Sequence, residues 1–215
     1  KAGWNPLPYP VQEEAPRPLP AALRSIEDRY TTVYGYYPTE TQPWRLYDID
    51  APAWLNNSAE FGLTTLEFGR GYWIRVTEPL TVSFQGGQTR GVPREVPGLA
   101  EAGIPYPPAT YYAELQPDGS FVPQSGMPVT AQIGDTVCGE STVQEVDGKL
   151  VFVLHVASAV EGEAECGLPK RRMRIAVGSS VLWEGVAWDN DRPGVLPWPA
   201  DSSDPISIYL PLVQR

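Results

Sequence analysis

The residue best suited to catalysis in this sequence is its only histidine, His155, which lies in the stretch VFVLHVAS. A lone imidazole could act as a general base, and any serine triad would have to use it. No G-x-S-x-G motif is present, and the GSSV at 178–181 is typical of a hairpin turn. Strand alternation places His155 opposite Phe152, Leu154 and Val156. We therefore interpret it as a strand residue on a solvated or partly covered face.

Acidic side chains are numerous, so residue count alone leaves open a two-carboxylate glycosidase. Most of them fall in turn sequences such as PDG, VDG and DND, which favours solvated surface charge. Two acidic clusters, DID at Asp48–Asp50 and DND with Asp189 and Asp191, are candidate calcium ligands, although neither has the spacing of an EF-hand loop. With one histidine and two cysteines, a four-ligand zinc site is disfavoured. We predict no catalytic residue, no metal and no cofactor.

The two cysteines, Cys138 and Cys166, are each followed by glycine in a turn-like context. A redox C-x-x-C motif is absent. The alternatives are two buried free thiols or one disulfide bond. We favour the disulfide, because the chain has the character of an extracellular protein.

Seven tryptophans are the remaining lead toward a binding function. Exposed Trp and Tyr rings can stack on sugars, whereas buried rings fill the core of a small domain that has few large aliphatic residues. We favour packing over stacking. The seven are Trp4, Trp44, Trp54, Trp73, Trp183, Trp188 and Trp198.

The composition excludes some classes of partner. The chain has 215 residues and a net charge of −10, so phosphate backbones and anionic lipid surfaces repel it. No apolar run is long enough to span a bilayer. The 24 prolines, 20 glycines and 11% aromatic residues are typical of short strands and loops. The start at KAGWN, in the middle of a pattern, suggests a processed fragment of a longer precursor.

The order of these patterns predicts a mainly β protein with two domains. Residues 1–88 form a small α+β domain with one helix, near 20–30, and a last strand at 80–84. Residues 89–108 are a linker rich in proline and glycine. Residues 109–198 show strand signals every 8–12 residues, with Asp-Gly turns at 118–119 and 147–148, which is typical of an Ig-like antiparallel β-sandwich.

Residues 199–215 are predicted to be a second linker that carries a terminal strand, ISIYLPLV. Ile206, Ile208, Leu210 and Leu212 would share one face, and Tyr209 would lie on the other. Three alternatives remain open for this segment: an edge strand folded onto its own domain, a donor strand for a neighbouring molecule, or a sorting tag.

Several motifs resemble modules of large secreted surface proteins of Chloroflexota and other bacteria. The first is a GWN start at 3–5 with a closing GRGYWI strand at 69–74; the second is a Cys-Gly and Cys-Gly pair in a companion β-sandwich; the third is the IYLPLVQR ending. The resemblance implies an extracellular location and a structural or adhesive role. It implies no reaction.

We therefore expect a non-catalytic, extracellular structural or interaction protein, such as a cell-surface or filament-forming subunit that assembles by strand addition of its tail. Its partners would be copies of itself or other surface proteins, with no nucleic acid and no membrane span. The alternative is a carbohydrate-binding or adhesion module that uses exposed Trp and Tyr. An enzyme is the third and least favoured hypothesis.

Overall fold

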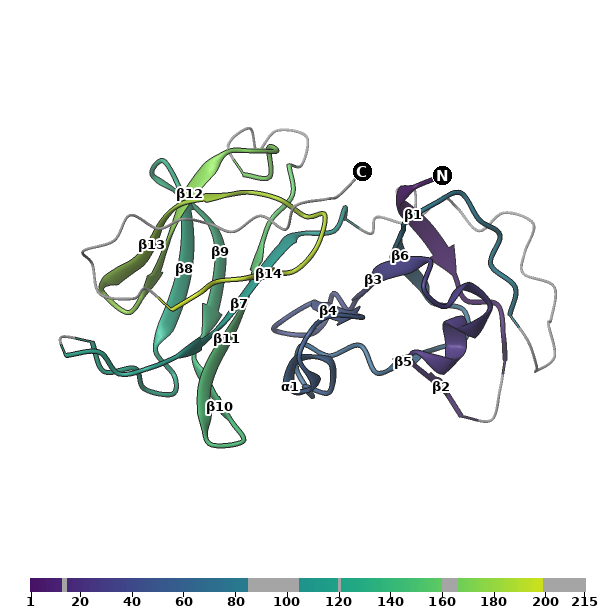
Figure 1. Cartoon of the computed structure of the whole chain (residues 1–215), viewed down its shortest axis with the longest axis horizontal. Helices are drawn as coiled ribbons and strands as arrows, with labels where there is room; N and C mark the ends of the chain where they lie inside the picture. Colours follow the sequence, from purple (N-terminus) through teal and green to yellow (C-terminus); the bar gives the residue numbers. More distant parts are fainter. Residues whose placement is uncertain (13–14, 85–104, 120, 160–165, 199–215) are drawn as a thin grey trace.

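The computed structural model describes residues 1–12, 15–84, 105–119, 121–159 and 166–198. Over these residues the protein is mainly β with two short helices, and antiparallel pairing dominates its sheets. The prediction of a mainly β protein with a sandwich-type domain is therefore confirmed. Figure 1 shows two groups of strands side by side. We call them the first unit, residues 1–84, and the second unit, residues 105–198.

The first unit is built on a four-stranded antiparallel sheet with the strand order β1-β6-β3-β4. Its strands are β1 (Gly3–Pro8), β3 (Tyr30–Tyr36), β4 (Trp44–Asp48) and β6 (Gly71–Val76). A small ribbon of β2 (Arg17–Pro18) and β5 (Thr65–Leu66), the 3-10 helix η1 (Ala21–Ile26) and the helix α1 (Ala53–Asn56) complete it.

Two local predictions for this unit need correction. The helix expected near 20–30 is only the 3-10 helix η1, whose first turn has no side-chain cap and no acidic residue. The strand expected at 80–84 does not form. Alternate residues of that segment, Leu80, Val82 and Phe84, nevertheless pack against the core of the first unit. The alternation of apolar residues therefore predicted correctly which side chains pack against the core, although the segment forms no strand.

The second unit contains two four-stranded sheets, in the orders β10-β11-β7-β14 and β13-β12-β8-β9. Pairing is antiparallel except between β14 and β7. The first sheet comprises β7 (Ala109–Leu115), β10 (Gln144–Val146), β11 (Lys149–Val156) and β14 (Gly194–Val195). The second comprises β8 (Pro128–Ile133), β9 (Thr136–Thr142), β12 (Arg172–Val177) and β13 (Ser180–Ala187).

The hairpin between β10 and β11 follows directly from its sequence. Asp147 and Gly148 both have positive φ, 52° and 74°, as a two-residue turn that matches the twist of the strands requires. The register pairs Val146 with Lys149 across this turn. The register in turn fixes which side chains of β11 face each side of the sheet.

Three clusters of buried hydrophobic residues hold the protein together. One lies inside the second unit and one inside the first. The third contains residues of both units and joins β4 and α1 to β7 and β11, which lie next to each other in Figure 1. The two units therefore share buried apolar surface, in addition to the chain that connects them.

Most of the predicted first linker and all of the terminal segment lie outside the described residues. The prediction that Ile206, Ile208, Tyr209, Leu210 and Leu212 form a strand is therefore not tested by the structure.

Candidate functional site

The contact between the two units gathers most of the residues that the sequence suggested for chemistry. Its apolar part places Tyr112 and Val153 of the second unit against aromatic and aliphatic side chains of the first. The six first-unit members are Trp4, Tyr34, Trp44, Leu46, Leu55 and Phe61. Burial of so many large side chains fixes the two units against each other.

Strand β11 is buried on both of its faces. Phe152, Leu154 and Val156 belong to the core of the second unit, while Val153 on the opposite face belongs to the shared cluster. His155 is on the same face as Val153 and is only 9% exposed. The first unit covers the face that the sequence left as solvated or partly covered, so His155 is an interface residue.

His155 ends a chain of buried hydrogen bonds that crosses the interface. The hydroxyl oxygen of Tyr34 lies 2.6 Å from Oγ1 of Thr110, which lies 2.8 Å from Nδ1 of His155. Thr110 is completely buried, so this hydroxyl cannot meet a substrate although it lies within hydrogen-bond distance of the imidazole. The three groups thus form an internal polar link between the units.

The surroundings of His155 keep its ring neutral. Burial lowers the pKa of His155 to about 4, and the main chain of Trp44 offsets that effect only in part. The rings of Tyr34 and Phe61 lie 6.4 and 6.1 Å from the imidazole, centroid to centroid. A charged imidazolium between these aromatic rings would lose its hydration. No acidic side chain is among the groups that shift the pKa of His155, so nothing would offset that loss.

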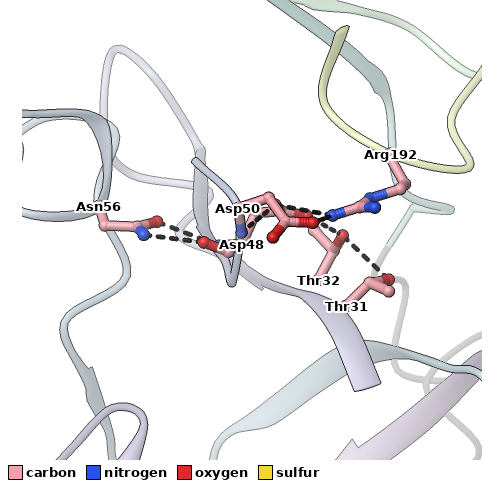
Figure 2. A network of polar contacts seen from close by, with 6 residues as sticks. All are labelled: Thr31, Thr32, Asp48, Asp50, Asn56 and Arg192. Carbon is pink, nitrogen blue, oxygen red and sulfur yellow. Dashed lines mark hydrogen bonds and ion pairs between the residues drawn. The ribbon is translucent and has the colours of Figure 1, made fainter. Parts of the chain in front are cut away.

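A second polar link connects the two acidic clusters of the sequence to arginines of the opposite unit. Arg192 of the second unit contacts the carboxylate of Asp50 and lies 3.6 Å from that of Asp48 (Figure 2). Asp48 is 3% exposed and accepts a 2.6 Å hydrogen bond from the Thr32 hydroxyl. The side chain of Asn56 pairs with the main chain of Asp48 through two hydrogen bonds. This network holds a buried carboxylate next to a cation from the other unit.

The DND cluster of the second unit is likewise paired with an arginine of the first unit. The Asp191 carboxylate lies 2.9 Å from the guanidinium of Arg75 and forms an ion pair with it. Its main-chain N–H donates to the Asp189 carboxylate, and the carbonyl of Asn190 accepts from the indole N–H of Trp4. Loop 189–192 is therefore tied to the first unit by both main-chain and side-chain contacts.

These pairings give the acidic clusters a structural use, as ion-pair partners between the two units. Within the described ranges, no group of three or more His, Cys, Asp or Glu side chains is placed to hold a metal ion. The carboxylates of Asp48, Asp50 and Asp191 are instead paired with arginine cations.

The tryptophans pack inside the protein, as the sequence favoured. Four are buried and the other three are half-buried, so the structure presents no fully exposed indole platform for a sugar. Trp4, Trp73, Trp183 and Trp188 donate their indole N–H groups to main-chain carbonyls. Trp54 lies edge-on to Tyr112 across the interface.

Cys138 and Cys166 form a disulfide bond, in agreement with the expectation from the sequence. The glycine after each cysteine has a steric reason. A Cβ on Gly139 would lie 2.5 Å from the carbonyl oxygen of His155, and one on Gly167 would lie 1.9 Å from the main chain of Ala159. Both Cys-Gly pairs thus bring the backbone against the end of β11 and the residues that follow it.

Sequence reasoning found the cysteines, His155 and both acidic clusters, but it did not bring them together. It missed Thr110, Arg75 and Arg192 as interface residues. One available signal was the run LVFVLHV, which lacks the alternation of a strand with one solvated face.

Comparisons with known proteins add no further information on this site. No protein family model matches the chain, and no curated protein or solved structure is significantly similar to it. Across the part of the chain that the structure describes, no helix has the length and apolar character needed to cross a membrane.

Proposed function

We propose that this is a non-catalytic structural protein of the cell exterior, a two-unit subunit that assembles by adding its C-terminal strand to a neighbouring molecule. The observation that carries the proposal is an eight-residue outer strand, β13, that ends its sheet. An outer strand offers N–H and C=O groups to an incoming segment. The segment ISIYLPLV also has eight residues.

Other edges of the sheets are less suitable acceptors. β1 contains Pro6 and Pro8, which have no N–H to donate. The outer side of β4 is already used, because Leu46 exchanges main-chain hydrogen bonds with 61–63. On β9, the carbonyl of Cys138 accepts from the N–H of Ala157. β10 and β14 have only three and two residues. These features favour β13 as the acceptor.

The C-terminal segment starts close to this edge. The ring of Trp198 lies 6.2 Å from that of Trp183 on β13, centroid to centroid. Residues 199–205 can span roughly 20 Å when extended, at about 3.3 Å per residue. This length is enough for the tail to pair with a β13 edge, either that of its own molecule or that of a neighbour.

The extracellular location rests on the disulfide, since such bonds persist in oxidising compartments. The non-catalytic role is supported by the use of the acidic clusters and His155 in holding the units together. The resemblance to modules of secreted surface proteins points in the same direction.

The test compares the full chain with a truncation that lacks residues 205–215, using size-exclusion chromatography with light scattering. We expect concentration-dependent assembly of the full chain and a folded, monomeric truncation. A synthetic ISIYLPLVQR peptide should bind to the truncation. Assembly that is unchanged by the truncation, or a full chain that stays monomeric at every concentration, would refute strand addition between molecules.

A pair of surface variants locates the acceptor edge. Val181→Lys places a charge on β13 at a site that is 47% exposed, and it should block peptide binding without unfolding the domain. Val122→Lys is the matched control, at an exposed site outside β13. Equal peptide binding by both variants would exclude β13.

A further inference from the structure

The outer strand β13 lies beside a group of cationic side chains that have no acidic partner. The other two cations of the second unit, Lys149 and Arg192, both form ion pairs. The four exposed cations at the start of β12 pair with no carboxylate among the described residues. They are Lys170, Arg171, Arg172 and Arg174. In a chain with a net charge of −10, such a group attracts acidic segments.

The guanidinium of Arg172 contacts β13 itself. Its Nη1 donates a 2.6 Å hydrogen bond to the carbonyl of Gly185. Gly185 has a φ of 72° and lies where the register between β12 and β13 shifts. A guanidinium has five N–H groups, so this bond leaves others for an acidic group that approaches the outer side of β13. Arg172 therefore places a positive charge at the edge that strand addition would use.

Main-chain pairing alone does not explain how β13 would select the C-terminal segment. Main-chain hydrogen bonds are the same for every incoming strand, and bulges in an outer strand make general pairing less favourable. The register of β13 with β12 is irregular at two places. A side-chain contact is therefore needed to select the tail and to fix its direction.

The charges of the C-terminal segment are arranged asymmetrically. Asp201 and Asp204 precede ISIYLPLV, and Arg215 follows it. Arg172 lies beside the end of β13 that contains Ala187, because the register pairs these two residues. A strand that enters at this end with its acidic residues first runs antiparallel to β13. A parallel strand would instead bring Arg215 to the same place, where like charges repel.

We propose that the C-terminal segment of a neighbouring molecule adds to β13 in the antiparallel direction, with Asp204 paired to Arg172. This inference rests on the proposed strand addition and specifies its direction. Only Pro205 separates Asp204 from the predicted strand, so the carboxylate reaches the bulge where pairing begins. Every strand pair already present in this sheet is antiparallel as well.

Charge reversal in the full chain tests the ion pair, at low ionic strength to limit screening. Arg172→Asp and Asp204→Arg should each weaken assembly roughly three- to tenfold, because an attraction is replaced by a repulsion. The double variant restores the pair in reverse and should recover most of the loss. Arg24→Asp, at an exposed site on η1 of the first unit, changes the net charge equally and should assemble like the wild type.

The direction of the strand is measured with a peptide of residues 199–215 that carries a nitroxide at Ser203→Cys or at Gln214→Cys. The receptor is the truncation that lacks residues 205–215, with Asp204→Asn so that its own carboxylate does not compete. The label at position 203 should broaden the amide NMR signals of 185–188. The label at position 214 should broaden those of 178–181.

The outcomes separate this inference from the proposed function. The reverse pattern of broadening, no recovery in the double variant, or equal assembly of Arg172→Asp and Arg24→Asp would each overturn the antiparallel pairing and leave strand addition standing. A full chain that does not assemble, together with a peptide that does not bind, would refute the proposed function and this inference with it.

Discussion

Acidification should weaken the protein through His155 at a pH where most carboxylates are still charged. In the folded state, burial lowers the pKa of His155 to about 4 from its ordinary value of 6.5. Below pH 6.5 the unfolded chain therefore binds a proton that the folded chain does not yet bind. The stabilisation is fully present above pH 6.5 and is lost as the pH falls toward 4.

The size of the loss follows from this difference in pKa. Each pH unit between the two values is worth about 1.4 kcal/mol, so the unfolding free energy should fall by about 3 kcal/mol between pH 7 and pH 4. That is a large part of the typical stability of a domain, which is about 5–15 kcal/mol. Because the histidine lies against Tyr34 and Phe61 of the first unit, its protonation should loosen the contact between the units first.

The assay is denaturant unfolding, followed by tryptophan fluorescence, at several pH values from 7 to 4. His155→Asn is the comparison, because its amide oxygen can still accept from Thr110 while its side chain does not titrate. The asparagine side chain is smaller than histidine, so this variant will be less stable at every pH. The quantity to compare is therefore the slope of the unfolding free energy against pH. It retains all the carboxylates of the wild type, so the difference between the two slopes isolates His155.

NMR titration of the single imidazole gives an independent measurement. We expect no titration step until the pH approaches 4. A midpoint near 6.5, or equal pH slopes for wild type and His155→Asn, would show that the ring is hydrated and that the buried link to Thr110 is absent in solution.

Three further predictions concern the contacts that hold the fold. Arg192→Met leaves the buried carboxylate of Asp48 without its cation and should lower the unfolding free energy by about 1–2 kcal/mol. The control is Lys149→Met, which removes an exposed pair with Glu114 and should cost less than about 0.5 kcal/mol in the same denaturation assay. Gly139→Ala forces a Cβ against the carbonyl of His155 and should cost about 1–3 kcal/mol, while Gly119→Ala, where a Cβ meets nothing, should be neutral; equal melting temperatures would contradict this. Replacement of both Cys138 and Cys166 by alanine opens a loop of 28 residues and should cost about 3–4 kcal/mol in the chain-entropy model, and reduction of the wild type should give the same change.

The parts of the fold that were predictable from sequence are those set by local chemistry. The Asp147-Gly148 turn needs positive φ at both residues, and few pairs other than Asp-Gly and Asn-Gly supply it. The pair of cysteines, each followed by glycine in a turn-like context, pointed to the disulfide bond that the structure contains. These features depend on a few neighbouring residues, so a single sequence carries enough information to predict them.

The site was not predictable in the same way, because it depends on how the two units meet. Asp48 and Arg192 are far apart in the chain, and nothing near either residue indicates the other. An acidic DID sequence is equally compatible with solvent, a metal ion or an arginine from another unit. The physical difference is the low exposure of Asp48, whose carboxylate lies between Thr32 of its own unit and Arg192 of the other.

The fixed contact between the units bears on how the protein can act. If the units moved independently, strand addition at β13 would join molecules at variable angles, and the product would be an irregular chain of beads. In this protein three sets of contacts hold different parts of the interface between the units. They are the shared apolar cluster, the buried Tyr34–Thr110–His155 link and the paired arginines. Each molecule would therefore repeat the same rotation and translation as the last, and a repeated operation of that kind produces an ordered filament. The interface that pairs the candidate catalytic residues with one another thus also supports the proposed role as a structural subunit.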